Sequence, residues 1–128
     1  MIKLKIFDGD LLSQGTVKDF SKLADSLKKA PKVEIRKETD GYLELVIAVN
    51  DLPKIYPALD EFFGPPFKPA GVEPSKEAAH HSAKYGGIQQ QQTLFYAEHK
   101  GLSTCAMLWP WQDKEHVTVK VAQGEILK

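Results

Sequence analysis

Residues 93–122, TLFYAEHKGLSTCAMLWPWQDKEHVTVKVA, contain three apolar segments separated by two turns. The segments have the two-residue period of β-strands, and Lys100-Gly101 and Asp113-Lys114 supply the turns. Pairing the segments through these turns predicts an antiparallel meander with two distinct faces. One face carries the residues that we expect in the core: Phe95, Ala97, Leu102, Ala106, Leu108, Val119 and Val121.

The opposite face of the meander is also rich in apolar residues. It carries Leu94, Tyr96, Cys105, Met107 and Trp109, mixed with His116, Thr118 and Lys120. An antiparallel sheet with one solvated face should alternate apolar with polar residues, so something must cover this second face. In one interpretation, residues 65–88 fold across it, including Ala78, Ala79 and Tyr85.

In the other interpretation, the second face binds a dimer partner, a peptide or a small ligand. Tyr, Trp and Met are enriched at such surfaces. The candidate partner or ligand face then consists of Leu94, Tyr96, Met107 and Trp109.

The N-terminal third predicts a strand, a helix and a hairpin. Residues 2–6 alternate apolar with lysine, and Thr16 is expected to cap a helix that Pro31 prevents from continuing. In the hairpin of residues 33–47, a two-residue turn would mismatch the apolar faces of the two strands. We therefore expect a three-residue loop at 39–41, which pairs Ile35 with Leu45 and Arg36 with Glu44.

The middle of the chain predicts two helices joined by a connector. Asp51 can cap a helix with apolar residues at helical spacing to Phe63, and Pro57 should bend or shorten it. Residues 64–74 form a proline-rich connector within a single domain, 1–128, because the part that follows is too small to fold alone.

The run HHSAKYGGIQQQQ, residues 80–92, joins the second helix to the meander. Ser75 is expected to cap this helix, which continues through Tyr85 and stops at Gly86. The first strand of the meander is expected to begin at Gln89, with residues 89–92 entering it. The glycines lack the spacing of a phosphate-binding loop.

The resulting order, β-α-β-β-α-(α)-β-β-β, predicts an α+β two-layer sandwich with a mainly antiparallel sheet. Two architectures resemble this order. One is a ferredoxin-like unit extended by the meander, and the other is a profilin-like, PAS-like or roadblock-like domain with an added first strand and helix. This resemblance is one of topology and does not imply a function.

Composition narrows the classes of partner. The 128 residues include 17 basic and 17 acidic side chains, so the chain lacks the net positive charge that supports binding to nucleic acid or an anionic membrane. No run approaches the roughly 20 apolar residues of a membrane-spanning helix. With the single Cys105 no intramolecular disulfide can form. We expect a soluble protein of the reducing cytoplasm.

The histidines and the cysteine do not form a recognisable catalytic or metal motif. His80 and His81 are adjacent, whereas helical zinc ligands are spaced at i and i+4. Cys105 lies within a predicted strand, and His99 falls on the opposite face of the predicted sheet. We therefore assign no catalytic, cofactor-binding or metal-binding residue.

The segment KIFDGDLL, residues 5–12, resembles the first motif of haloacid dehalogenase-like phosphotransferases. The resemblance implies Asp8 as nucleophile and Asp10 as acid/base. The Gly-Thr that should follow Asp10 is missing, as are a later acidic pair and the repeated βα units of that fold. Asp-Gly-Asp is also common in turns.

The sequence favours a small non-enzymatic module for protein interaction, regulation or ligand sensing. We expect a homodimer or another protein partner at the meander, and a small-molecule ligand is left open. The alternative is a small enzyme. It would gather His80, His81, His99 or His116 with an acid or Cys105 in a cleft near residues 64–88.

Overall fold

The computed structural model describes residues 19–31 and 33–126. Their elements are α1 (Phe20–Leu27), β1 (Glu34–Thr39), β2 (Tyr42–Ala48), the 3₁₀ turn η3 (Val49–Asp51), α2 (Leu52–Phe63), α3 (Lys76–Ser82), the 3₁₀ turn η4 (Ala83–Tyr85), β3 (Thr93–His99), β4 (Leu102–Pro110) and β5 (His116–Glu125). The α+β class and the element order from α1 onward are confirmed. The expected strand at 2–6, Asp8 and Asp10 lie outside the described residues.

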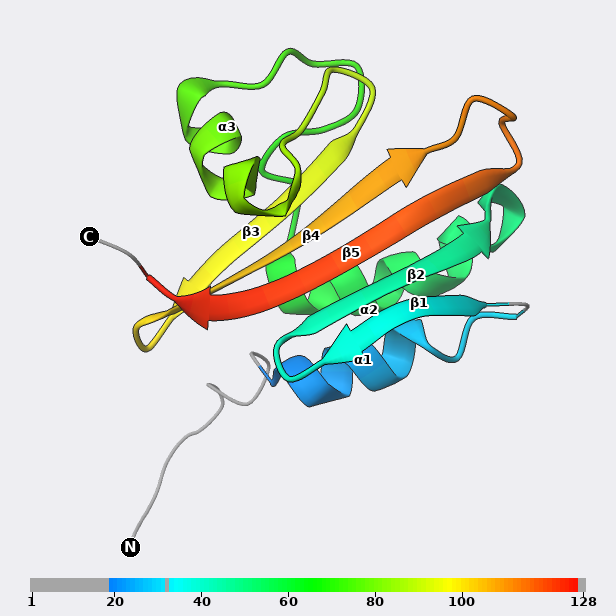
Figure 1. Cartoon of the computed structure of the whole chain (residues 1–128), viewed down its shortest axis with the longest axis horizontal. Coiled ribbons are helices and arrows are strands. Elements are labelled where there is room, and N and C mark those ends of the chain that lie inside the picture. The colour runs from blue at the N-terminus through cyan, green and yellow to red at the C-terminus, as the bar shows by residue number, and fades with distance from the viewer. Residues whose placement is uncertain (1–18, 32, 127–128) are drawn as a thin grey trace, which may run out of the picture.

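The five strands form one antiparallel sheet with the order β1-β2-β5-β4-β3 (Figure 1). β5 lies at the centre, because it pairs with β2 on one side and with β4 on the other. The last strand of the chain therefore joins the β1–β2 hairpin to the meander. Helices α1 and α2 lie together along one face of the sheet, and α3 lies on the other face beside β3.

The main core lies between the sheet and helices α1 and α2. Fully buried branched side chains of β2 and β5 pair across the strands, Leu43 with Val121 and Leu45 with Val119. They pack against Leu27 of α1 and Leu59 of α2, both with no exposed surface. Burial of such side chains contributes roughly 1.5–3 kcal/mol each, so this layer dominates the stability of the fold.

The predicted register of the meander is confirmed. His99 pairs with Leu102 across the Lys100-Gly101 turn, and Pro110 pairs with Val117 across the second loop. The two predicted faces follow from this register. Both turns were readable because a short loop allows few registers in which the apolar faces agree.

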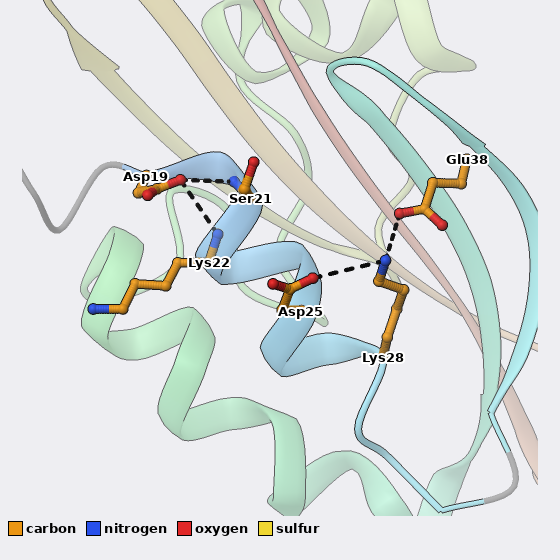
Figure 2. Close-up of polar contacts among 6 residues, drawn as sticks. All are labelled: Asp19, Ser21, Lys22, Asp25, Lys28 and Glu38. Atoms are coloured by element: carbon orange, nitrogen blue, oxygen red, sulfur yellow. Dashed lines mark hydrogen bonds and ion pairs between the residues drawn. The ribbon is translucent and has the colours of Figure 1, made fainter.

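Helix α1 begins at a different residue from the one expected. Asp19, not Thr16, is the N-cap, and its carboxylate accepts hydrogen bonds from the amides of Ser21 at 2.9 Å and Lys22 at 3.3 Å (Figure 2). Thr16 lies outside the described residues. At the other end of the helix, the Lys28 ammonium donates to Glu38 of β1 at 2.6 Å, which fastens the helix to the edge of the sheet (Figure 2).

In the first hairpin Ile35 pairs with Leu45, as expected, but the expected three-residue loop is wrong. The turn has two residues, since Thr39 pairs with Tyr42, and a bulge lies between Ile35 and Lys37. The bulge restores the match of the apolar positions that a two-residue turn alone would lose. Glu44 consequently faces Lys37 and not Arg36.

Helix α2 runs through Pro57 for its whole length of 12 residues, so the proline does not shorten it. Asp51 occupies the expected cap position but makes no capping hydrogen bond through its side chain. Its carboxylate instead accepts from the Lys54 ammonium at 3.2 Å. The preceding 3₁₀ turn is itself a right-handed helical turn that leads directly into α2. The helix therefore begins without a capping hydrogen bond from the Asp51 carboxylate.

The connector has to pass around an edge of the sheet, because α2 and α3 lie on opposite faces. It does so at β3, where Lys68 and Leu94 exchange two backbone hydrogen bonds of 3.0 and 2.9 Å. The Lys68 side chain is only 3% exposed. Its ammonium donates to the backbone carbonyls of Gln89, Gln90 and Gln92 at 2.8, 2.6 and 2.6 Å.

Residues 89–92 therefore form a turn around an ammonium group and not the start of a strand. The Gln92 amide donates to the Gln89 carbonyl at 3.0 Å, and β3 begins at Thr93. Burial lowers the pKa of Lys68, while the Glu73 carboxylate opposes this shift. The three carbonyls provide the hydrogen bonds that a buried ammonium requires.

Candidate functional site

The second face of the meander is covered in part by the chain itself. Ala78 of α3 and Ile88 pack against Leu94, Cys105, Met107 and Ala122 in a second buried cluster. Tyr85 packs against the edge of this cluster, whereas Ala79 is exposed. The interpretation in which residues 65–88 cover this face is thus the one that the structure supports.

The four residues of the candidate partner face have different environments. Leu94 and Met107 have no exposed surface, so their side chains cannot contact a partner in this conformation. Tyr96 and Trp109 are partly buried at the margin of the same cluster. A partner or ligand role for the set stays a prediction, and the structure leaves only Tyr96 and Trp109 able to take part directly.

Trp109 is held from two sides. The Lys120 ammonium lies 3.6 Å from its ring centroid and also donates to the Tyr85 carbonyl at 3.2 Å. Gly86 lies against the ring edge. These contacts hold the C-terminal end of α3–η4 against the sheet. The contact between the Lys120 ammonium and the Trp109 ring is an attractive cation–π interaction.

A cleft of about 250 Å³ opens between α3–η4 and the sheet. Its lining combines four residues of the helical segment with five from the meander strands and the residue that follows β5. The first group is His80, His81, Lys84 and Tyr85, and the second is Tyr96, Glu98, Ser103, Glu125 and Ile126.

An aromatic stack forms one wall of this cleft. The rings of His81 and Tyr96 are parallel within 11° with centroids 3.6 Å apart, and Phe67 of the connector meets both edge-on. Burial lowers the pKa of His81 and the neighbouring His80 lowers it further, while Glu98 and Glu77 act in the opposite direction. The His81 ring is therefore mainly neutral at pH 7.

Tyr96 also orients a carboxylate at the mouth of the cleft. Its hydroxyl donates to Glu98 Oε2 at 2.7 Å. Burial, followed by the hydrogen bond to Glu98, raises the pKa of Tyr96 to about 12. The hydroxyl consequently keeps its proton at neutral pH and serves as a permanent donor to Glu98.

The edge of β3 next to the cleft is open. Leu94 directs its amide and carbonyl away from β4 toward Lys68, so the alternating backbone directs those of Tyr96 and Glu98 outward as well. Within residues 19–31 and 33–126, no backbone hydrogen bond reaches these two outward positions. Pro66 would lie opposite Tyr96 if the bridge continued, but proline has no amide to donate.

The opposite edge of the sheet is protected. β1 carries the charged sequence Glu34-Ile35-Arg36-Lys37-Glu38, is exposed along its whole length and contains the bulge. Bulges and charged side chains are common means of preventing strand addition. The unpaired edge of β3, from Tyr96 to Glu98, differs from β1 because an aromatic stack and a cleft lie beside it.

Of the groups expected for an enzyme, His80 and His81 share the cleft with Glu98, whereas Cys105, His99 and His116 lie elsewhere. Cys105 is 3% exposed, and burial raises the pKa of its thiol to about 12. His99 lies on the sheet face opposite to Cys105, as predicted from the register. In the described part of the chain, no group of three or more His, Cys, Asp or Glu side chains is arranged to hold a metal ion.

His116 forms a pair with Asp113 at the far end of the meander, with Nδ1 and Oδ2 2.6 Å apart. The same carboxylate accepts from the amides of Glu115 at 2.8 Å and His116 at 3.1 Å. These bonds lower the pKa of Asp113. The pair is explained as the closure of the loop, and only His80 and His81 lie in the cleft near the connector.

Comparison with protein-family models, curated proteins and solved structures finds no match for this chain. In the residues that the structure describes, no helix has the length and apolar character needed to cross a membrane.

The sequence predicts some of the residues that line the cleft but not the others. It places a possible site near residues 64–88 and singles out His80, His81 and Tyr96. Glu98, Ser103 and Glu125 carried no signal, because each is an ordinary polar residue near a strand end. The position of Glu98 and Ser103 on one face follows from the predicted register, but the position of α3 above them does not. The register places Glu125 opposite Leu102, so its contact with the cleft could not be predicted.

Proposed function

We propose that this protein is a non-enzymatic interaction module that binds an extended peptide segment of a partner protein. The peptide adds to the free edge of β3 and extends the sheet by one strand. Main-chain hydrogen bonds supply much of the affinity in this mode of recognition, and side-chain pockets supply specificity.

One observation carries the proposal: the outward amides and carbonyls of Tyr96 and Glu98 lack partners in the described chain, between the Lys68 bridge and the Lys100-Gly101 turn. An open strand edge is a template for another strand. Lys68 already uses the preceding outward position in this way. A partner strand would continue the row of hydrogen bonds that the connector begins.

The predicted homodimer is a competing use of the same edge. Two copies could pair β3 with β3, but the free segment is short and would give a small interface compared with stable dimers. This comparison favours a peptide. We also propose a cytoplasmic location, which agrees with a single cysteine that is a buried thiol.

The test uses random dodecapeptides displayed on phage, selected against the full chain and then synthesised. We expect selected peptides to shift the NMR signals of the Tyr96 and Glu98 amides and to slow their hydrogen exchange. Glu98→Pro removes an outward amide without removing a β3–β4 hydrogen bond, since proline is tolerated where the amide faces away from the partner strand. This variant should weaken binding at least tenfold.

Glu98→Gln is the matched control, because it changes the side chain but keeps the outward amide. Peptides selected for this edge should bind Glu98→Gln more tightly than Glu98→Pro. If Glu98→Pro unfolds, protection of the Tyr96 amide in the wild type decides the question by itself. Selected peptides that leave these amides unprotected, or a dimer in sedimentation that Glu98→Pro dissociates, would overturn the peptide proposal.

A further inference from the structure

Glu98 belongs to both the free edge and the cleft. Its backbone lies at the open edge of β3, and its side chain stands at the mouth of the cleft, where Tyr96 holds its carboxylate. Side chains of an added strand alternate between the two faces of the sheet. Every second side chain of the strand therefore lies on the same face as Glu98 and the cleft.

The mouth of the cleft has one carboxylate that is fixed in place. Glu98 of β3 accepts from the Tyr96 hydroxyl on the cleft face, whereas Glu125 lines the cleft but pairs with Leu102, which belongs to the opposite face of the sheet. Lys84 contributes an ammonium on the helical side of the cleft. Lys84 is exposed, and its ammonium lies 6.0 Å from the centroid of the Tyr85 ring. The wall of the cleft thus already accommodates one cation, beside an aromatic ring.

The remaining lining suits a long side chain with a charged end. The stacked rings of His81 and Tyr96 offer a flat surface, and Tyr85 and Ile126 offer apolar contact. Arginine and lysine bury their aliphatic stems on such surfaces and keep the charged group near water or an acid. The lowered pKa of His81 removes one source of repulsion toward a cation at pH 7.

We infer that the cleft is the specificity pocket of the peptide site and takes an arginine or lysine side chain of the added strand. The charged end lies at the Glu98 carboxylate, and the stem lies along the Tyr96–His81 stack. This inference rests on the proposed function. It adds a partner class, extended segments with a basic residue, that the open edge alone does not define.

The probes are capped pentapeptides, Thr-Xaa-Thr-Xaa-Thr, in which Xaa is arginine, lysine, citrulline, leucine or glutamate. Citrulline has nearly the shape of arginine without its charge. Each probe is titrated into the isotope-labelled full chain and followed by NMR. We expect the arginine and lysine probes to bind about fivefold more tightly than the citrulline probe and to shift the signals of Ser103 and Glu125.

Variants of the chain assign this preference to the cleft. Glu98→Gln should remove the difference between arginine and citrulline, whereas Glu61→Gln, which removes a charge from α2 on the other face, should preserve it. Lys84→Ala should strengthen binding of the arginine probe, because it removes a competing cation.

The outcomes separate the inference from the function on which it rests. Equal binding of all probes at the β3 edge would leave the peptide function standing and overturn the basic-residue pocket. A preference for arginine that survives in Glu98→Gln would also overturn it. Absence of any shift at Tyr96 and Glu98 with every probe and every selected peptide would overturn both.

Discussion

Gly86 meets two separate requirements at the end of the helical segment. Its backbone has a φ of +110°, in the left-handed region that L residues seldom adopt. A Cβ atom at this position would also lie 2.7 Å from Cη2 of Trp109. The first requirement is visible in the sequence as a glycine after a helix. The second requirement is not, since it depends on a strand 23 residues further along the chain.

Gly86→Ala should destabilise the protein by about 2–4 kcal/mol, from backbone strain and from overpacking against Trp109. Gly87→Ala is the matched control, because Gly87 also has a positive φ, +83°, but a Cβ added there would meet no atom within 4 Å. Backbone strain alone should cost about 1–2 kcal/mol there. Urea unfolding of both variants gives the difference, and equal losses would mean that the Trp109 contact is unimportant.

Lys68 is the residue whose role is least evident from the sequence, because lysine is normally exposed. Lys68→Met should cost about 1–3 kcal/mol, since it removes the ammonium from three backbone carbonyls. The carbonyls of Gln89 and Gln90 keep the amides of Gln92 and Gly71 as donors, whereas the Gln92 carbonyl loses its ammonium donor. The exposed Lys22→Met is the control and should have little effect on the unfolding midpoint. Little loss at Lys68 would show that water replaces the ammonium in the turn.

Helix α3 carries a pH dependence through His81. Because burial lowers its pKa below the ordinary 6.5, the unfolded chain binds the proton more readily than the folded chain does. Stability from this group is thus complete above pH 6.5 and falls as the pH decreases through 6.5 toward the lowered value. The cleft wall formed by His81 and Tyr96 should loosen in the same range.

The expected result is a lower urea midpoint at pH 5 than at pH 7.5, part of which disappears in His81→Phe. Phenylalanine keeps a ring on Tyr96 but cannot be protonated. His80→Phe keeps the His81–Tyr96 stack and removes only the charge that helps lower the pKa of His81, so it should reduce the pH dependence less than His81→Phe does. An identical pH dependence in the wild type and in His81→Phe would contradict the assignment to His81.

The two hairpins show which elements a sequence can predict. The β3–β4 turn has two residues, and the apolar faces of the strands agree without correction, so the register was predictable. In the β1–β2 hairpin, the bulge at Arg36 compensates for the two-residue turn. Sequence pattern alone cannot distinguish a longer loop from a shorter loop with a bulge, since both pair Ile35 with Leu45.

The arrangement of the elements in the whole molecule is harder to predict from the sequence than the elements themselves. Alternation in the meander indicated two apolar faces, but not that β5 inserts beside β2 or that Lys68 of the connector reaches the turn at 89–92. These contacts join segments far apart in the chain. The cleft has the same origin, because its strand residues, among them Glu98 and Ser103, come under α3 only when β3, β4 and β5 are in place.

Cys105 reports on opening of the whole molecule. It lies in β4 between the strands and the cover formed by α3 and Ile88, and its raised pKa leaves almost no thiolate at pH 8. We expect a disulfide reagent to label it very slowly in the native protein and rapidly in urea. Labelling at the rate of a free thiol in native buffer would mean that the cover over the second face opens readily.

The shortness of the open edge limits the strength of any association there. Tyr96 and Glu98 can supply at most four main-chain hydrogen bonds, because each residue has one donor and one acceptor and the Lys68 bridge occupies the next position. Because so few hydrogen bonds can form, a peptide that binds only at this edge should dissociate rapidly. Lasting attachment would then require a second linked contact between the same two partners, because the open edge of β3 is a single site and avidity arises only when both partners contribute at least two.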